Sequence, residues 1–320
     1  MRIYLLNAPY RPNFVRCGRW QGVAARGGTL YYPLWLAYAT GLLEQSGHTV
    51  KLVDAIAAKW DLEDVITDAK TFNPDLIVVD SNFSSMNNDI MVANTLKEHT
   101  NAKTVLVGPP ASQFTEKILL AGVDIVARFE FDFTLKEVAE TIENGKPLRD
   151  VKGISYIENG EIQHTPSREV TTAKDLDSLP FVSAVYKKHL KIEDYFLNHA
   201  FYPMVQIFTT RGCPNQCTFC SWPETLMGRT YRGRSVKNIA EEFEYIVSEL
   251  PEVKEIFIED DSFTINKKRV IEFCKELQKR NIRISWSCQS RATLDYETMK
   301  AMREAGCRLL DVGYESGNDE

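Results

Sequence analysis

Three cysteines grouped in one short stretch are the residues best suited to chemistry in this 320-residue sequence. Cys213, Cys217 and Cys220 have the spacing C-x₃-C-x₂-C and follow an apolar run at 204–208 that predicts a strand. Thiolates on a loop of this kind are typical ligands of zinc or of an iron–sulfur cluster. Because glycine, proline and side-chain amides surround them, we do not expect the three to be buried as apolar side chains.

The number of ligands separates the two kinds of metal site. Structural zinc sites use four Cys or His ligands. Here the next cysteines, Cys274 and Cys288, lie far along the chain, and no histidine follows His199. An iron–sulfur cubane held by three thiolates leaves one iron with an open position. The trio therefore favours a cluster that binds a further molecule over a structural zinc site.

The elements around the cysteines predict a row of parallel strands. After the first strand, apolar runs at 255–259, 283–287 and 308–312 alternate with amphipathic stretches at 236–250, 267–280 and 296–305. This is a repeated strand–helix pattern. We expect residues 203–320 to form the first four strands of a (β/α) barrel, which is incomplete because the chain is truncated or because another chain completes it.

The N-terminal part predicts a separate α/β domain. Continuous Val, Ile and Leu runs alternate with helical patterns, which is typical of a parallel sheet covered on both faces. We expect a Rossmann-like, doubly wound domain at 1–150, then a hairpin and linker at 151–202. Ligands of such sheets bind beyond the carboxyl ends of the strands. Here the strands are predicted at 2–8, 49–54, 75–80, 104–108 and 124–127, and the helices at 33–46, 62–72, 89–99, 113–121 and 135–144.

Composition excludes several classes of protein. Apolar residues make up 44% and charged residues 26%, which is ordinary for a globular chain. The net charge of −6 gives no support for nucleic-acid binding. No apolar run is long enough for a membrane span. Seven cysteines, scattered apart from the trio, do not resemble a secreted disulfide framework. We expect a cytoplasmic protein.

The cysteine stretch resembles the signature of the radical S-adenosylmethionine (SAM) superfamily. The resemblance implies that the three cysteines bind a [4Fe–4S] cluster whose fourth iron is chelated by SAM, and that Phe219 lies against the adenine. Further stretches match that family in order. They imply that SAM is held through its amino group by Asp260 or Asp261, through Arg291, and through its ribose by Glu315 and Ser316.

The layout of a doubly wound domain before that signature resembles the cobalamin-binding branch of the superfamily, close to class B methyltransferases. Residues 47–54 and 106–111 resemble its cobalamin domain, and 220–235 resemble the loop of members linked to hopanoid biosynthesis. The family's histidine ligand to cobalt is absent after Asp54, which implies base-off cobalamin without a protein histidine. The candidate cobalamin-binding residues are Asp54, Ser81, Gly108, Pro109 and Glu130.

The resemblance implies reductive cleavage of SAM to a 5′-deoxyadenosyl radical, followed by methylation, cyclisation or ring rearrangement at an unactivated carbon. The implied partners are a small-molecule or lipid-like substrate and an electron donor such as flavodoxin or ferredoxin. Two alternatives stay open. One is radical SAM chemistry without cobalamin, and the other is a non-catalytic fragment that binds a metal such as zinc.

Overall fold

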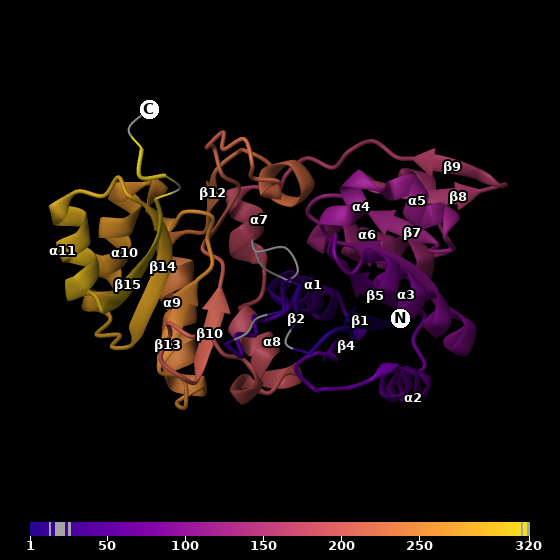
Figure 1. Ribbon diagram of the computed structural model, residues 1–320, viewed down its shortest axis with the longest axis horizontal. Helices are drawn as coiled ribbons and strands as arrows, with labels where there is room; N and C mark the ends of the chain where they lie inside the picture. The colour runs from indigo at the N-terminus through magenta and orange to yellow at the C-terminus, as the bar shows by residue number, and fades with distance from the viewer. Residues whose placement is uncertain (13, 17–22, 25–26, 315, 319–320) are drawn as a thin grey trace.

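The computed structural model describes residues 1–12, 14–16, 23–24, 27–314 and 316–318. Two sheets lie side by side, and one hydrophobic cluster contains residues from both (Figure 1). The first sheet comes from the part of the chain coloured indigo to rose, and the second from the orange to yellow part. The fold is therefore α/β, as the sequence predicts, and two units pack on each other through apolar side chains.

The first sheet has the strand order β4-β1-β5-β6-β7-β8-β9. Strands β4 to β7 are parallel to their neighbours, and β8 and β9 add an antiparallel hairpin at the β7 edge. The order reverses at β1, which marks the position where doubly wound sheets bind ligands. The hairpin extends this sheet beyond residue 150. The strands are β1 (Arg2–Asn7), β4 (Thr49–Asp54), β5 (Leu76–Asp80), β6 (Lys103–Val107), β7 (Ile125–Ala127), β8 (Ile154–Glu158) and β9 (Glu161–His164).

Helices cover both faces of the first sheet, as expected for alternating strands and helices. Helices α1 and α6 pack on one face and α2, α3 and α5 on the other. Local sequence sets their ends: Asp61 and Asp64 form a capping box before α2, and Asn73 ends that helix in the left-handed conformation. The helices are α1 (Leu34–Gln45), α2 (Leu62–Phe72), α3 (Met86–Thr100), α4 (Pro109–Gln113), α5 (Thr115–Leu120) and α6 (Asp132–Glu143).

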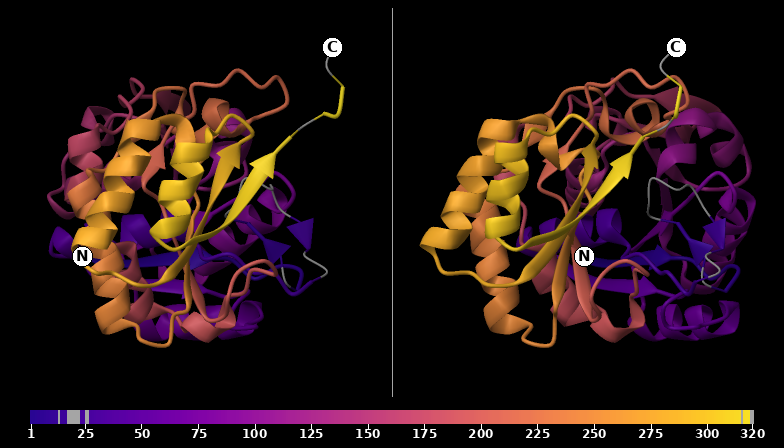
Figure 2. Two further views of the ribbon diagram at one scale, coloured as in Figure 1. Left: turned by 90° about the vertical axis from the view of Figure 1, so that its left-hand side faces the viewer. Right: turned by 60° about the vertical axis from the view of Figure 1, so that its left-hand side comes forward.

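The second sheet has four parallel strands in the order β10-β13-β14-β15. Three helices lie together on one side of it, and the described residues do not close it into a barrel (Figure 2). Each helix begins at a polar N-cap whose side chain accepts a backbone N–H. The elements are β10 (Met204–Ile207), α9 (Val236–Glu249), β13 (Glu255–Ile258), α10 (Lys267–Lys279), β14 (Ser285–Arg291), α11 (Tyr296–Glu304) and β15 (Cys307–Gly313).

The segment between the sheets is helical and packed rather than an extended linker. It contains α7 (Ala173–Ser178), α8 (Val182–His189) and a short 3-10 turn, η2 (Ile192–Asp194). Three buried tyrosines stack where this segment meets the first unit, with Tyr32 3.8 Å from Tyr195 and 4.1 Å from Tyr186 between ring centroids. The segment therefore contributes to the core that joins the two sheets.

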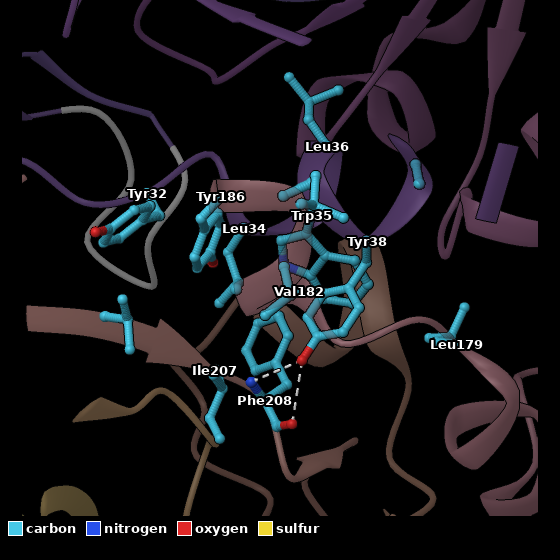
Figure 3. Packing of buried hydrophobic residues seen from close by; sticks show 14 of the residues in the cluster. Tyr32, Leu34, Trp35, Leu36, Tyr38, Leu179, Val182, Tyr186, Ile207 and Phe208 are labelled. Atoms are coloured by element: carbon cyan, nitrogen blue, oxygen red, sulfur yellow. Dashed lines mark hydrogen bonds between the residues drawn. The ribbon is translucent and has the colours of Figure 1, made fainter. Parts of the chain in front are cut away.

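Helix α1 lies at the centre of that shared core (Figure 3). Trp35, Tyr38 and Leu42, which have helical spacing, are buried on it. The Tyr38 hydroxyl accepts a hydrogen bond from the Phe208 N–H at 3.1 Å and donates one to the Phe208 carbonyl at 3.2 Å. Because Phe208 follows β10 directly, this one side chain ties the first unit to the first strand of the second.

The strands and helices predicted from the sequence occur in the predicted order in both alternations, with most ends shifted by a few residues, but the single helix predicted at 113–121 is replaced by two short helices, α4 and α5. The segment between β1 and α1 contains a ribbon of two short strands, β2 (Phe14–Val15) and β3 (Val23–Ala24). Cys17, which we interpret as a plain loop thiol, lies outside the described residues. No helix within the described ranges combines the length and the apolar character needed to cross a bilayer.

Candidate functional site

The three cysteines lie on a loop whose two ends are paired. Strand β11 (Thr210–Arg211) precedes the loop and β12 (Arg232–Gly233) follows it, and the two form an antiparallel ribbon. The loop also contains a π-helical turn, η3 (Pro223–Met227). All three cysteines are half-buried. A loop whose ends are paired and whose thiols are partly accessible is suited to binding a metal cluster.

The donor set fits an iron–sulfur cluster. Soft thiolates on one short loop are the ligands that such clusters use. Among the described residues, no three His, Cys, Asp or Glu side chains are gathered closely enough to hold a metal ion as they stand. The three thiols would therefore have to move closer together when a cluster binds.

Glycine is required at the start of the loop. Gly212 has φ +84°, and a Cβ placed there would lie 2.0 Å from the Thr230 carbonyl oxygen. The Gly212 N–H also donates to the Met227 sulfur at 3.2 Å. The two ends of the loop therefore approach each other more closely than any other residue would allow.

Arg291, which the family resemblance implies as a SAM ligand, contacts the cysteine loop, and its role in SAM binding stays a prediction. Its guanidinium donates to the side-chain carbonyl of Asn215. The Asn215 amide in turn donates to the Cys213 sulfur at 3.3 Å. Hydrogen bonds to ligand sulfurs tune the reduction potential of clusters, and the ligand spacing alone did not reveal this contact of Asn215.

Asp260 has a different environment from the one expected of a SAM ligand. It is fully buried, and its carboxylate accepts hydrogen bonds from the Thr209 N–H at 2.6 Å, the Thr209 hydroxyl at 2.5 Å and the Thr210 N–H at 2.8 Å. Burial raises its pKa, against the opposing effects of Arg269 and of these hydrogen bonds. In this structure Asp260 fixes the turn that leads into the cysteine loop, and the half-buried Asp261 lies beside it.

The remaining candidates for SAM binding either have exposed side chains or lie outside the described residues. The Phe219 side chain is 71% exposed, so its ring is free to stack on a planar ligand. Ser316 is exposed and its hydroxyl accepts the Asn318 N–H at 3.0 Å. Glu315 lies outside the described residues. The contribution of these three to SAM binding stays a prediction.

A buried polar trio in the second sheet was missed by the sequence analysis. The Glu259 carboxylate accepts from the Gln206 amide at 3.0 Å and from the Gln289 amide at 3.1 Å. All three are buried and come from neighbouring strands or their ends. Polar residues at alternate positions of β10 and β14 were the available signal, because alternate residues share one face of a strand.

At the carboxyl ends of the first sheet, the predicted residues are engaged within the protein. Asp54 accepts from the Asn7 amide, from two backbone N–H groups after β4 and from the Tyr195 hydroxyl. The Ser81 hydroxyl donates to Asp89 at 2.9 Å, and Asp89 pairs with the buried Arg16 at 2.7 Å. These side chains form one buried network at the strand ends.

Gly108 and Pro109 form the tight turn after β6. Gly108 has φ +96°, and a Cβ there would lie 2.3 Å from the Ser81 carbonyl oxygen. Pro109 is the buried first residue of α4. The Asp80 carboxylate also approaches this point, at 2.7 Å from such a Cβ, so only glycine fits in the turn.

Glu130 lies in an ion pair instead of facing the strand-end surface. Its carboxylate accepts from Arg232 at 2.8 and 2.9 Å and from the Thr171 N–H and hydroxyl at 2.9 and 2.8 Å. Nothing on the carboxylate is left exposed for a cofactor, since the side chain is only 5% exposed. These contacts connect the first unit to the cysteine loop and do not support the expected role in cobalamin binding.

Comparison with known proteins divides the chain as the structure does. Residues 207–320 match the Radical SAM superfamily, and residues 20–139 match the B12 binding domain. The chain is 32% identical to an uncharacterized methyltransferase, PH0819, of Pyrococcus horikoshii, over 91% of this chain and 62% of that protein. It is 29% identical to an anaerobic magnesium-protoporphyrin IX monomethyl ester cyclase of Cereibacter sphaeroides, over 89% of this chain and 47% of that protein.

Among solved structures, the fold resembles the cobalamin-dependent S-adenosylmethionine radical enzyme OxsB with aqua-cobalamin and S-adenosylmethionine bound. The TM-score is 0.76 at 20% identity, covering 99% of this chain and 44% of OxsB. The chain thus spans only about two fifths to three fifths of the length of these three proteins.

Proposed function

Because the chain belongs to the radical SAM proteins that carry a B12 binding domain, we propose that it forms the cofactor-binding part of a cobalamin-dependent radical SAM enzyme. The observation that carries the proposal is the loop with three half-buried cysteines between the paired strands β11 and β12. A [4Fe–4S] cluster bound there, together with SAM, would supply a 5′-deoxyadenosyl radical.

The protein's own residues would hold and orient these groups. Cys213, Cys217 and Cys220 are the cluster ligands, and the side chain of Asn215 supports the first of them through its hydrogen bond. Arg291 fixes Asn215 from the end of β14. The exposed ring of Phe219 offers a stacking surface for an adenine. The paired strands β11 and β12 hold the two ends of the loop in place in the absence of the cofactor.

Cobalamin would lie over the carboxyl ends of the first sheet, where the order of strands reverses. The residues for this are the backbone at Ser81, Gly108 and Pro109, since the side chains of Asp54 and Ser81 make internal hydrogen bonds. The relatives' names suggest the reaction class, namely transfer of a methyl group or ring closure at an unactivated carbon of a small-molecule or lipid-like substrate. A flavodoxin or ferredoxin in a reducing cytoplasm would supply the electron.

A second candidate function is radical SAM chemistry without cobalamin. It is favoured by one observation: Asp54, Ser81 and Glu130 are all buried and hydrogen-bonded within the protein. Purification without oxygen in the presence of excess hydroxocobalamin separates the two candidates. We expect a corrinoid to elute with the protein, and a protein free of corrinoid under saturating supply would leave only the second candidate.

The cluster itself is tested by iron and sulfide analysis after reconstitution. We expect about four iron and four sulfide per chain in the wild type. The triple variant Cys213→Ala, Cys217→Ala, Cys220→Ala should bind neither. Cys274→Ala is the matched control, because that thiol is buried in the core and its pKa is raised to about 12 by burial. Zinc without sulfide in the wild type would refute the proposal.

A further inference from the structure

The base of the cysteine loop carries two buried arginines side by side. Arg211 and Arg232 are direct partners in the β11–β12 ribbon, so one stands at each end of the loop. The Arg211 side chain is 1% exposed and that of Arg232 is 6% exposed. Two guanidinium charges this close in the interior repel each other, and each needs a buried counter-charge to offset this repulsion and its own loss of hydration.

Both partners come from one short segment of the first unit. Asp132, the first residue of α6, accepts from Arg211 at 2.6 and 3.2 Å in a two-bonded geometry. Glu130, two residues earlier, accepts from Arg232 at 2.8 and 2.9 Å. Both carboxylates are buried. The two ends of the cysteine loop are therefore fastened to the end of β7 in the other sheet.

Further contacts hold each arginine in a single orientation. The guanidinium of Arg211 lies over the Trp35 ring at 4.2 Å from its centroid, which places it against α1. Arg232 also donates to the carbonyls of Met227 and Thr230, at 2.5 and 2.9 Å, within the loop itself.

From these contacts we propose that Glu130 and Asp132 are positioning residues for the metal centre, which set the cysteine loop against the first sheet and balance the charge of the two arginines below it. The inference rests on the proposed function, because it assumes that the loop binds a cluster. Neither carboxylate touches the cysteines, so both act through Arg211 and Arg232.

The test uses the full chain with Asp132→Asn and Glu130→Gln, which keep the shape of each side chain and remove its charge. We expect faster amide hydrogen exchange over residues 212–231 in the protein without a cluster. After reconstitution, we expect a higher midpoint potential and an altered electron paramagnetic resonance spectrum, because an unbalanced positive charge then lies beneath the cluster. Asp132→Glu keeps the charge and should retain the wild-type potential.

Glu242→Gln is the matched control. Glu242 pairs with the buried Arg234 at 2.6 Å, but it belongs to α9 of the second unit and does not link the loop to the first sheet. It should lower thermal stability while leaving the exchange of the loop and the potential near wild type. If Asp132→Asn and Glu130→Gln behave like Glu242→Gln, the inference is refuted. A wild type that binds no iron and sulfide would instead refute the proposed function and the inference with it.

Discussion

Tyr195 donates a hydrogen bond from its hydroxyl to a carboxylate oxygen of Asp54 at 3.1 Å, inside the core. Tyr195 lies in the segment between the two sheets, and Asp54 ends β4 of the first. The carboxylate also accepts from the Asn7 amide at 2.8 Å. Even so, burial raises the pKa of Asp54 to about 6, since the hydrogen bonds offset only part of the cost of a buried charge.

This raised pKa predicts a pH dependence of stability. The folded protein binds the Asp54 proton more tightly than the unfolded chain does, so the free energy of unfolding should fall as pH rises from about 4 to about 6. The full loss is roughly 3 kcal/mol above pH 6. Asp54→Asn should lack this pH-dependent contribution to the free energy of unfolding. The measurement is urea unfolding of variant and wild type across that pH range, where the difference between their free energies of unfolding should change with pH. A constant difference would contradict the shifted pKa.

Tyr38→Phe should weaken the junction between the two units. The substitution removes both hydrogen bonds to the backbone of Phe208 and leaves a buried N–H and carbonyl without that partner. We expect a loss of about 2 kcal/mol in the free energy of unfolding. Tyr296→Phe serves as the control, because that residue is largely exposed and should change stability little. Equal effects of the two substitutions would show that the bridge to Phe208 contributes nothing.

Phe129 has a strained backbone, with φ +60°, at the end of β7. A bulky residue in the left-handed region costs about 1 kcal/mol or more, a cost that glycine does not incur. Phe129→Gly should therefore be more stable than Phe129→Ala by about 1 kcal/mol, since the two variants both lack the ring and differ only in Cβ. Thermal unfolding of this pair measures the strain. An alanine variant that equals or exceeds the glycine variant would contradict it.

Arg291→Ala should weaken SAM binding by roughly tenfold, since charge-assisted hydrogen bonds contribute about 1.5 kcal/mol or more. It also removes the contact that orients Asn215 beside Cys213. The measurement is the dissociation constant for SAM of the reconstituted protein. Arg303→Ala, on the exposed side of α11, is the control and should bind SAM as the wild type does. Unchanged binding in Arg291→Ala would remove this residue from the site.

The sequence predicts the elements well because their apolar periodicity is strong. The strand at 49–54 and the helix at 62–72 match β4 and α2 to the residue. The position of Arg291 next to the cysteine loop also follows from parallel strands that end at one edge. Long-range pairing is what the sequence could not show. Nothing in the local pattern around Glu130 indicates a partner 102 residues away, so its carboxylate was assigned to a cofactor rather than to Arg232.

For Asp260 the sequence leaves two roles open, and its part in SAM binding stays a prediction. An acidic residue after a strand can bind a ligand or cap a turn, and both roles have the same sequence pattern. Only the three donors from Thr209 and Thr210 distinguish them, and these come from a strand about fifty residues earlier. Buried polar contacts between distant strands therefore account for most of what sequence analysis missed.

The paired ends of the cysteine loop have a consequence for how such proteins diversify. Arg211 and Arg232 lie opposite each other and close the loop. Each doubling of the length of the segment between them would raise the entropic cost of closing the loop by only roughly 0.6 kcal/mol. Since Trp222, Leu226 and Met227 are buried, insertions between Cys220 and β12 are expected only at exposed positions such as Glu224 or Arg229. The β11–β12 ribbon thus keeps the two ends of the loop paired when the length of the loop changes.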